Sequence, residues 1–534
     1  MTSSARPTGR QLPDEIHPAD LLTTAKSLLA EDFRIALIAG QDDGDALRVV
    51  YLFLRAGTDR RIELQLTLDP AHPHVPSLSS ISFSAGRFER EMRDLFGIVP
   101  DDHPLPRRLV RHFHWPRGWY PMRASAGDPP PFGDVDGPYP FRTVEGPGVY
   151  EIPVGPVHAG MIGPGHFRFS VVGETVLNLK ARLWFVHRGI EKLFQGSDPE
   201  RGIELAERIS GDTSVGHSLA YCTAVEDALG VTVPVAAQRI RATLLELERL
   251  YNHVGDIGAL CNDVGHSILN SQALRVRERL LRLNDDVTGS RLLRGSITVG
   301  GAQVHALPDP VVLAAIGADI AEIAALALEH SVVRDRFTGT AVLTRQQAVD
   351  LGTVGPVARA SGLDLDARYD HPVAGVDYPP RLPVRTDGDV LARFLVRTEE
   401  IAHSIATIVA LLPQVSAAGS VPAGPAPPAG PAPPAGPGPR PANSGPPVPL
   451  PGRRSGPPVP QHGRRSGIGI VEGWRGMIVH RVELAAAGEL TRVKVVDPSF
   501  VNWPALPIAM ADTIVPDFPL ANKSFNLSYA GNDL

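Results

Sequence analysis

The stretch QRIRATLLELERLYNHVGDIGALCNDV, residues 238–264, decides the fold class of the larger part of this chain. Its core positions recur at steps of three and four residues, at Leu244, Leu247, Tyr251, Val254 and Gly258. That spacing places them on one face of an α-helix, as a helix packed against a core requires. Helical periodicity dominates from Leu177 to Asp285, and it predicts a helical bundle.

Outward from the bundle, the sequence predicts the limits of this second domain. A loop followed by a strand is expected over Gly155 to Thr175, and the domain begins near residue 149 and runs to residue 414. Order resumes for residues 468–534, with strand-like runs at Met477 to Val482 and Thr491 to Val496.

Between these parts, residues 415–467 repeat the units AGPAPP, SGPPVP and GRRSG. Such Pro/Gly tracts bury too little apolar area to offset chain entropy, so a disordered insert with polyproline character is expected. A passive spacer and a ligand for the aromatic groove of a partner are both open.

A smaller domain precedes the bundle. Three short runs rich in Ile, Val and Leu are separated by Gly/Asp turns and read as strands, at Phe33 to Ile38, Arg48 to Leu54 and Ile62 to Leu68. A helix-like segment, Leu21 to Ala30, comes before them. We expect a compact α+β domain over residues 21–120, after a disordered tail at 1–20 and before a Pro/Gly-rich linker at 121–148.

Composition excludes several classes of function. The 534 residues, 43% of them hydrophobic, suffice for two cores, and a net charge of -6 lacks the basic excess of a nucleic-acid binder. The polar N-terminus has no secretory layout, so a cytoplasmic location is expected. The most apolar stretch, Val311 to Leu328, contains Asp319 and Glu322, and Ile401 to Leu412 is short, so we expect no membrane span.

Cysteine usage limits metal chemistry. Cys222 and Cys261 are the only cysteines and form no CxxC pair. This excludes a disulfide framework and an all-cysteine metal site within the chain, and both residues are expected to be small buried apolar side chains.

The segment FEREMRDLFGIVPDDHPLPRRLV, Phe88 to Val110, followed by Pro121, Met122 and Arg123, resembles the signature of the 30 kDa-type subunit of respiratory complex I. Its charges lie on Arg87, Glu89, Arg90, Glu91, Arg93 and Asp94. From the residues alone a solvated surface is expected. The resemblance implies instead that this surface docks on partner subunits.

The second domain resembles the 49 kDa-type subunit of complex I and the large subunit of membrane-bound nickel-iron hydrogenases. The matching stretches are EIPVGPVHAG at Glu151, HFRF at His166, HRGIEKL at His187, AYCTAVEDALG at Ala220, ITVGGAQ at Ile297, GPVARASG at Gly355, EGWRG at Glu472 and DPSFVNWPALP at Asp497. The resemblance implies a mainly α-helical, hydrogenase-large-subunit-like domain with small β elements. The tail NKSFNLSYAGNDL favours the branch of formate hydrogenlyase.

The nickel ligands of that family are replaced here. Hydrogenases supply four thiolates in two motifs, and soft sulfur suits nickel. In RISGDTSVGH, residues 208–217, Ser210 and Thr213 stand at the cysteine positions, and in NLSYAGND, residues 526–533, Ser528 and Gly531 do. Hydroxyls stay protonated at neutral pH, so no metal is expected at this vacated site.

Other family positions are kept or lost. Arg208 and Arg475 are retained, whereas Gly163 stands where the hydrogenases carry a proton-relaying glutamate. In complex I a tyrosine and a histidine hold the quinone headgroup, and Gly211 and Ile162 align with them. Hydrogen chemistry is therefore not expected, and the quinone ligands are missing.

Several side chains remain candidates for catalysis. His158, His166, His187 and His217 could replace the lost quinone ligands, or each could be a hydrogen-bonded structural group. Glu191 could belong to a proton path toward a membrane partner, or it could pair with Arg188 at a helix start.

The resemblance implies a large-subunit-like component of a membrane-associated complex I- or hydrogenase-related assembly, peripheral to the inner face of the cell membrane. Its partners would be an iron-sulfur small subunit and integral membrane subunits. The alternatives are a quinone-reducing fused subunit of an NADH dehydrogenase and a catalytically silent scaffold. No GxGxxG follows a strand, so NAD binding has no support.

Overall fold

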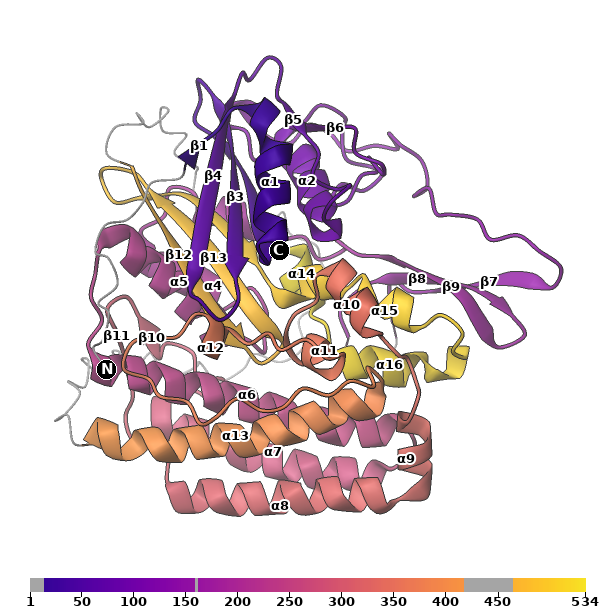
Figure 1. The fold of residues 1–534 in the computed structure, drawn as a ribbon, viewed down its shortest axis with the longest axis vertical. Coiled ribbons are helices and arrows are strands. Elements are labelled where there is room, and N and C mark those ends of the chain that lie inside the picture. Colours follow the sequence, from indigo (N-terminus) through magenta and orange to yellow (C-terminus); the bar gives the residue numbers. More distant parts are fainter. Residues whose placement is uncertain (1–13, 159–161, 417–463) are drawn as a thin grey trace, which may run out of the picture.

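The computed structural model describes residues 14–158, 162–416 and 464–534. Its first part is built on a four-stranded sheet in the order β1-β4-β3-β2 (Figure 1). The strands are β1 Asp14–Glu15, β2 Phe33–Asp42, β3 Leu47–Arg55 and β4 Arg60–Leu68. The three predicted strands and the predicted helix, α1 Leu21–Ala30, are confirmed. A second helix, α2 Phe83–Phe96, packs on β2.

The last residues of the tail that was expected to be disordered, residues 14–20, form regular structure. Strand β1 pairs in parallel with Leu64 and Gln65 of β4, and the Glu15 carboxylate accepts hydrogen bonds from the side chains of Gln65 and Thr67. Residues 14–20 are therefore structured because their backbone completes the edge of the sheet. Residues 1–13 lie outside the described part.

Four long helices form a layer at one side of the second domain (Figure 1). They are α6 Val235–Asp263, α7 Ser267–Thr288, α8 Pro310–Glu329 and α13 Val390–Ser416. The core positions predicted on α6 are all buried, which confirms the helix and its packed face. At Gly258 an added Cβ would lie 2.7 Å from Ala273 Cβ, so this glycine allows α7 to approach closely.

Short strand pairs and short helices connect these larger elements. One short parallel pair is β5 His74–Pro76 with β6 Val99–Asp101, and β10 Ile297–Thr298 pairs with β11 Gly301–Ala302. The short helices are α3 Ile190–Phe194, α4 Pro199–Ala206, α9 Ser331–Phe337, α10 Arg345–Leu351, α11 Gly355–Ala360, α12 Ala367–Asp370, α14 Pro498–Asn502, α15 Ala505–Ala509, α16 Phe518–Phe525 and α17 Tyr529–Asp533.

One part of the predicted helical region is a strand. The antiparallel sheet β7 Val149–Val154, β8 His166–Val172 and β9 Thr175–Arg182 includes Leu177, where helical periodicity was expected to begin. Val176 is buried and its neighbour Leu177 is 43% exposed, which is the alternation of a strand. The first helix of this domain starts only at Ile190.

A sheet from the C-terminal part lies between the helices and the first domain. It consists of β12 Arg465–Gly473, β13 Gly476–Leu484 and β14 Leu490–Val496 in sequence order. Helix α5 Ser214–Leu229 packs on β12 and β13. At Gly469 an added Cβ would lie 1.8 Å from the carbonyl oxygen of Ala220, so only glycine permits this contact. Both predicted strands of this region are confirmed.

The charges of α2 are the largest departure from expectation. A solvated surface was expected, but Glu89, Arg90, Glu91 and Asp94 are buried. The Glu91 carboxylate accepts from Lys494 Nζ at 2.8 Å, and Lys494 belongs to β14 of the second domain. The solvated interpretation is therefore wrong, because the helix docks on the other domain of the same chain.

A second group of ion pairs joins the same two parts. Arg48 of β3 donates to Glu483 of β13 at 2.8 Å, and Arg481 donates to Glu63 of β4 at 3.0 Å. Arg481 and Glu483 are 2% and 3% exposed. These pairs and Lys494–Glu91 form what we call the charged seam.

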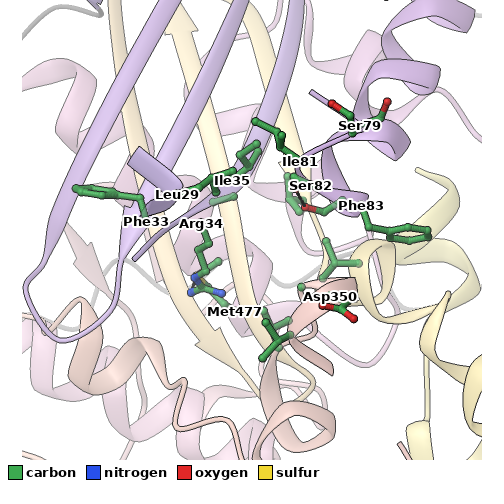
Figure 2. Close-up of a pocket in the computed structure, with 18 residues that line it drawn as sticks. Leu29, Phe33, Arg34, Ile35, Ser79, Ile81, Ser82, Phe83, Asp350 and Met477 are labelled. Atoms are coloured by element: carbon green, nitrogen blue, oxygen red, sulfur yellow. Dashed lines mark hydrogen bonds between the residues drawn. The ribbon is translucent and has the colours of Figure 1, made fainter. Parts of the chain in front are cut away.

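A cavity of about 490 Å³ is lined by residues of both domains (Figure 2). Its walls come from β2, residues 79–84, α10 and β13. Arg34 points from β2 toward Met477, and its Nη2 lies 3.1 Å from the Met477 sulfur. Burial lowers the pKa of Arg34, and the carboxylates of Asp370 and Glu472 partly offset this.

Helix α8 is long and apolar enough to cross a membrane, and it is the one such helix in the described part of the chain. It packs on α7 and α13, and its Asp319 forms an ion pair with Arg279 of α7. Such packing is typical of an outer helix of a bundle.

The predicted linker contains almost no regular structure, and the predicted insert is bounded by a helix and a strand. Residues 121–148 contain one 3-10 turn, Ala124–Ala126, and neither an α-helix nor a strand. Helix α13 continues to Ser416 and β12 starts at Arg465, so both ends of the predicted insert belong to regular elements. The rest of the insert, residues 417–463, lies outside the described residues.

Candidate functional site

The two motifs that replace the nickel-binding motifs meet in space. Ser210 lies before α5, Thr213 precedes its first residue, and Ser528 precedes the first residue of α17. The hydroxyls of Ser210 and Ser528 are 2.8 Å apart, and Gly531 N donates to Ser528 Oγ at 2.9 Å. We call Ser210, Thr213, Ser528 and Gly531 the hydroxyl site.

An ion pair borders one side of the hydroxyl site. Asp212 accepts from the hydroxyls of Ser210 and Thr213 at 2.9 and 3.0 Å. It also accepts from both terminal nitrogens of Arg475, at 2.7 and 2.6 Å. Burial opposes ionisation, but the charge and hydrogen bonds of Arg475 outweigh it and keep the Asp212 pKa well below its usual value. The Asp212 side chain is 39% exposed, so the site reaches solvent here.

A buried histidine pair lies behind the hydroxyl site. His217 Nε2 is 3.0 Å from the Asp497 carboxylate, and His217 Nδ1 is 3.1 Å from His480 Nε2. Both rings are fully buried. Burial, and then the neighbouring His217, lower the pKa of His480 well below its usual value. Burial alone would raise the pKa of the Asp497 carboxyl, but the hydrogen bond with His217 outweighs it, and the pKa is lowered.

Asp497 also occupies the space of the fourth ligand position. A Cβ at Gly531 would lie 2.5 Å from the Asp497 carboxyl carbon. The place of a side chain at 531 is therefore taken by this carboxylate, which Ser499 N holds at 2.7 Å.

Comparison with protein families matches three parts of the chain. Residues 15–127 match the 30 Kd subunit of the respiratory-chain NADH dehydrogenase, and residues 263–432 match its 49 Kd subunit. Residues 188–256, which include α5 and the first half of the hydroxyl site, match the nickel-dependent hydrogenases.

Several relatives match most of the chain. Formate hydrogenlyase subunit 5 of Escherichia coli K12 is 30% identical over 493 residues, covering 90% of this chain and 81% of the relative. The chain belongs to this family of fused complex I- and hydrogenase-type subunits. The C/D subunit of the NADH-quinone oxidoreductase of Phocaeicola vulgatus is 30% identical, covering 71% of this chain and 78% of the relative.

A solved structure has the same fold. A chain of the membrane-bound sulfane sulfur reductase, an archaeal respiratory membrane complex, superimposes with a TM-score of 0.59 at 24% identity. The match covers 72% of this chain and 98% of that one.

The residues of this family member do not fit a nickel-iron centre. The hydroxyls of Ser210 and Ser528 bond to each other, and Asp497 fills the place beside Gly531. Within residues 14–158, 162–416 and 464–534, no three His, Cys, Asp or Glu side chains are grouped to hold a metal. Both cysteines lie elsewhere, are buried as expected, and have pKa values raised by burial, for Cys261 to about 12.

Tyr529 fills the place of the lost proton relay. A Cβ at Gly163 would lie 2.6 Å from Tyr529 Cβ, so the tyrosine ring packs where the family's glutamate side chain begins. The positions that align with the quinone ligands are open instead: Ile162 is 52% exposed, and a Cβ at Gly211 would meet no atom of the described residues within 4 Å.

The other candidate histidines bond to backbone carbonyls. His158 Nε2 lies 2.9 Å from the Gly165 oxygen, and His166 Nδ1 lies 3.0 Å from the Gly155 oxygen, so both close one loop upon itself. His187 Nδ1 is 2.7 Å from the Asp533 oxygen, and burial lowers its pKa. Of the four, only His217 belongs to the cluster behind the hydroxyl site.

Glu191 pairs with Lys494 of the charged seam and not with Arg188. Its carboxylate pairs with Arg492 at 2.7 Å and with Lys494 at 3.0 Å, whereas Arg188 donates to the carbonyls of residues 208 and 209. Of the two interpretations left open for Glu191, the pairing with Arg188 is therefore wrong. Burial alone would raise the pKa of Glu191, but the charges of Arg492 and Lys494 outweigh it and lower the pKa to about 2.

The two retained arginines, Arg208 and Arg475, lie in different environments. Arg475 borders the hydroxyl site, but Arg208 is exposed and donates to the Glu204 carbonyl at 2.7 Å. Sequence reasoning missed Asp212, Asp497 and His480. The first two lie inside the motifs already quoted, and a carboxylate between two hydroxyl residues in SGDTS was the available signal.

Proposed function

We propose that this chain is a large-subunit-like, nickel-free component of a membrane-associated redox complex, held at the inner face of the cell membrane. The hydroxyl site carries the proposal: the family's metal positions converge, but their polar groups bond to one another and to Asp212. Such a site fixes the junction of two motifs without supplying a ligand. It supports a structural or electron-path role in place of hydrogen chemistry.

The partners follow from the relatives and from the surface. Relatives carry the names of subunits of formate hydrogenlyase and of NADH-quinone oxidoreductase, and the solved neighbour belongs to a respiratory membrane complex. The loop beside the hydroxyl site presents Val157 at 87% exposure and Ile162 at 52%. An iron-sulfur small subunit that covers this loop would remove both from water.

Purification of the native complex in mild detergent tests this function. We expect an iron-sulfur protein and at least one integral membrane protein to co-purify, because permanent interfaces usually bury more than about 2,000 Å². The Val157→Asp variant should lose the iron-sulfur protein, whereas Leu274→Asp, a control at a half-exposed position on α7, should keep it. A native protein that fractionates alone would contradict the proposal.

A quinone-reducing subunit is the second candidate. The exposed Asp212 carboxylate and the open space at Gly211 favour it, since a headgroup could approach Asp212 there, whereas the Ser210 and Thr213 hydroxyls are buried behind it. The quinone would accept electrons from a partner's cluster, and the chain would bind and orient it. Inhibition of the purified complex by a quinone analogue, lost in Asp212→Asn, would support this candidate, and full quinone activity of that variant would count against it.

A further inference from the structure

A second cavity, of about 260 Å³, lies between the domains and is distinct from the hydroxyl site. It shares Ser79 and Phe83 with the cavity of Figure 2. Its walls come from α2, residues 103–109, the end of β9 and the turn before α15. We call it the arginine cavity, because Arg87, Arg90 and Arg182 line it.

No carboxylate lines the arginine cavity, and within the described residues none of its three arginines forms an ion pair. Their acceptors are neutral. Arg87 donates to the Asn532 side chain at 3.1 Å, Arg90 to the Arg107 carbonyl at 2.8 Å, and Arg182 to the Arg111 carbonyl at 2.9 Å. Glu91, Asp94 and Asp533 act on them only through space.

The positive charge of this cavity is poorly compensated. Burial first, and then the neighbouring Arg90, lower the pKa of Arg87 to about 9. Burial also lowers the pKa of Arg182 to about 10, and Arg108 and Arg90 add to this. Burying cations without an anionic partner costs free energy. A bound anion would therefore stabilise this cavity by compensating its positive charge.

Aromatic rings hold the guanidinium groups in position. Arg182 lies 4.6 Å from the centre of the Tyr139 ring, and Arg87 lies 5.4 Å from that of Trp184. Trp503 and Pro504 form an apolar wall of the same cavity. The cavity therefore combines fixed cations with a surface for a carbon skeleton.

We propose that the arginine cavity binds a phosphate monoester, with its phosphoryl group on Arg87, Arg90 and Arg182 and its apolar part on Trp184 and Trp503. Guanidinium groups match phosphoryl oxygens in geometry, and three of them supply enough positive charge to neutralise a dianion. The alternative is that the arginines serve only to hold the backbone of residues 107–111. A soluble monoester and the headgroup of phosphatidic acid share this chemistry.

Calorimetric titration of the full chain tests the site, with phenyl phosphate and inorganic phosphate as probes at an ionic strength fixed by chloride. We expect both to bind, phenyl phosphate more tightly. Arg87→Gln should weaken binding by about tenfold or more, since it removes charge-assisted hydrogen bonds. The matched control Arg282→Gln, at an exposed ion pair on α7, should bind as the wild type does.

Two further measurements keep the test decisive. Phosphate should raise the melting temperature of the wild type and of Arg87→Lys more than that of Arg87→Gln, because a ligand stabilises the state that binds it. Sedimentation with phosphatidylcholine vesicles that contain phosphatidic acid, lost in Arg87→Gln, assigns a lipid headgroup, and phenyl phosphate binding without sedimentation assigns a soluble ligand. Equal binding by wild type and Arg87→Gln, or no binding of either probe, overturns the proposal.

Discussion

Gly531 and Asp497 show how one residue position determines the chemistry of the hydroxyl site. In the hydrogenases a thiolate stands at this position, whereas here the glycine leaves room for a carboxylate bonded to His217. The site is thereby filled by the protein's own hydrogen bonds.

Replacing Gly531 by alanine should destabilise the protein by about 1–3 kcal/mol, because the new methyl group overlaps the Asp497 carboxylate and forces it to move. Gly211→Ala is the matched control, since nothing lies near its Cβ and its backbone is unstrained. Urea unfolding measures both. Equal stability of the two variants would show that Asp497 moves away without cost.

Glu191→Gln should cost about 3–5 kcal/mol at pH 7, because it leaves the buried Lys494 and Arg492 without this partner. The folded-state pKa of Glu191 is lowered, so its contribution is complete above the unfolded value of about 4.3 and is lost as pH falls toward about 2. The stability difference between wild type and variant should therefore shrink over that window. Unfolding curves at several pH values check this, and a constant difference would contradict the assignment.

The positions of the hydroxyl site could be predicted from sequence because two motifs mark them. Their partners could not, since Arg475 and Asp212 are joined only by the fold. The same limit explains Glu191: Arg188 is close in sequence, but Lys494 and Arg492 are close in space.

Helix α2 connects the domains through carboxylates that face inward. Asp94 accepts from the backbone N–H groups of Leu109, Val110 and Arg111, at 2.7, 2.9 and 3.1 Å. It thus fixes the segment that carries the carbonyls bonded by Arg90 and Arg182.

Asp94→Ala should lower stability by about 2–4 kcal/mol, because buried N–H donors lose their acceptor. Limited proteolysis should then cleave near residues 105–111 faster than in the wild type. Asp45→Ala, at an exposed turn, should change neither property. Unchanged cleavage in Asp94→Ala would show that other contacts hold the segment.

Helix α6, with its apolar period, and strands β2 to β4, with their runs of Ile, Val and Leu, could be predicted to within about four residues of their ends. The burial of the α2 charges could not be predicted, because the sequence pattern of a charged helix is the same whether its side chains face water or a buried lysine. Leu177 was assigned to a helix because β9 has only 8 residues and is soon followed by α3, so its two-residue period is brief beside the helical pattern that follows.

At the scale of the whole molecule, the fused chain should bind no nickel. Metal analysis of the purified protein should find nickel far below one atom per chain, since its two cysteines are buried away from the hydroxyl site. Stoichiometric nickel would overturn this, and a double variant, Cys222→Ala with Cys261→Ala, would then show whether those thiols hold it.

The charged seam has a consequence for the covalent joining of the two domains. As separate proteins, partners held by buried ion pairs would have to offset lost translational freedom as well as desolvation. Residues 121–148 tether the two faces, so each meets the other at an effective concentration in the millimolar range. The tether makes assembly independent of protein concentration and fixes one copy of each domain per complex. Because the two domains are fused, the buried ion pairs need only fix how the two faces align. The interface does not also need a high affinity of its own.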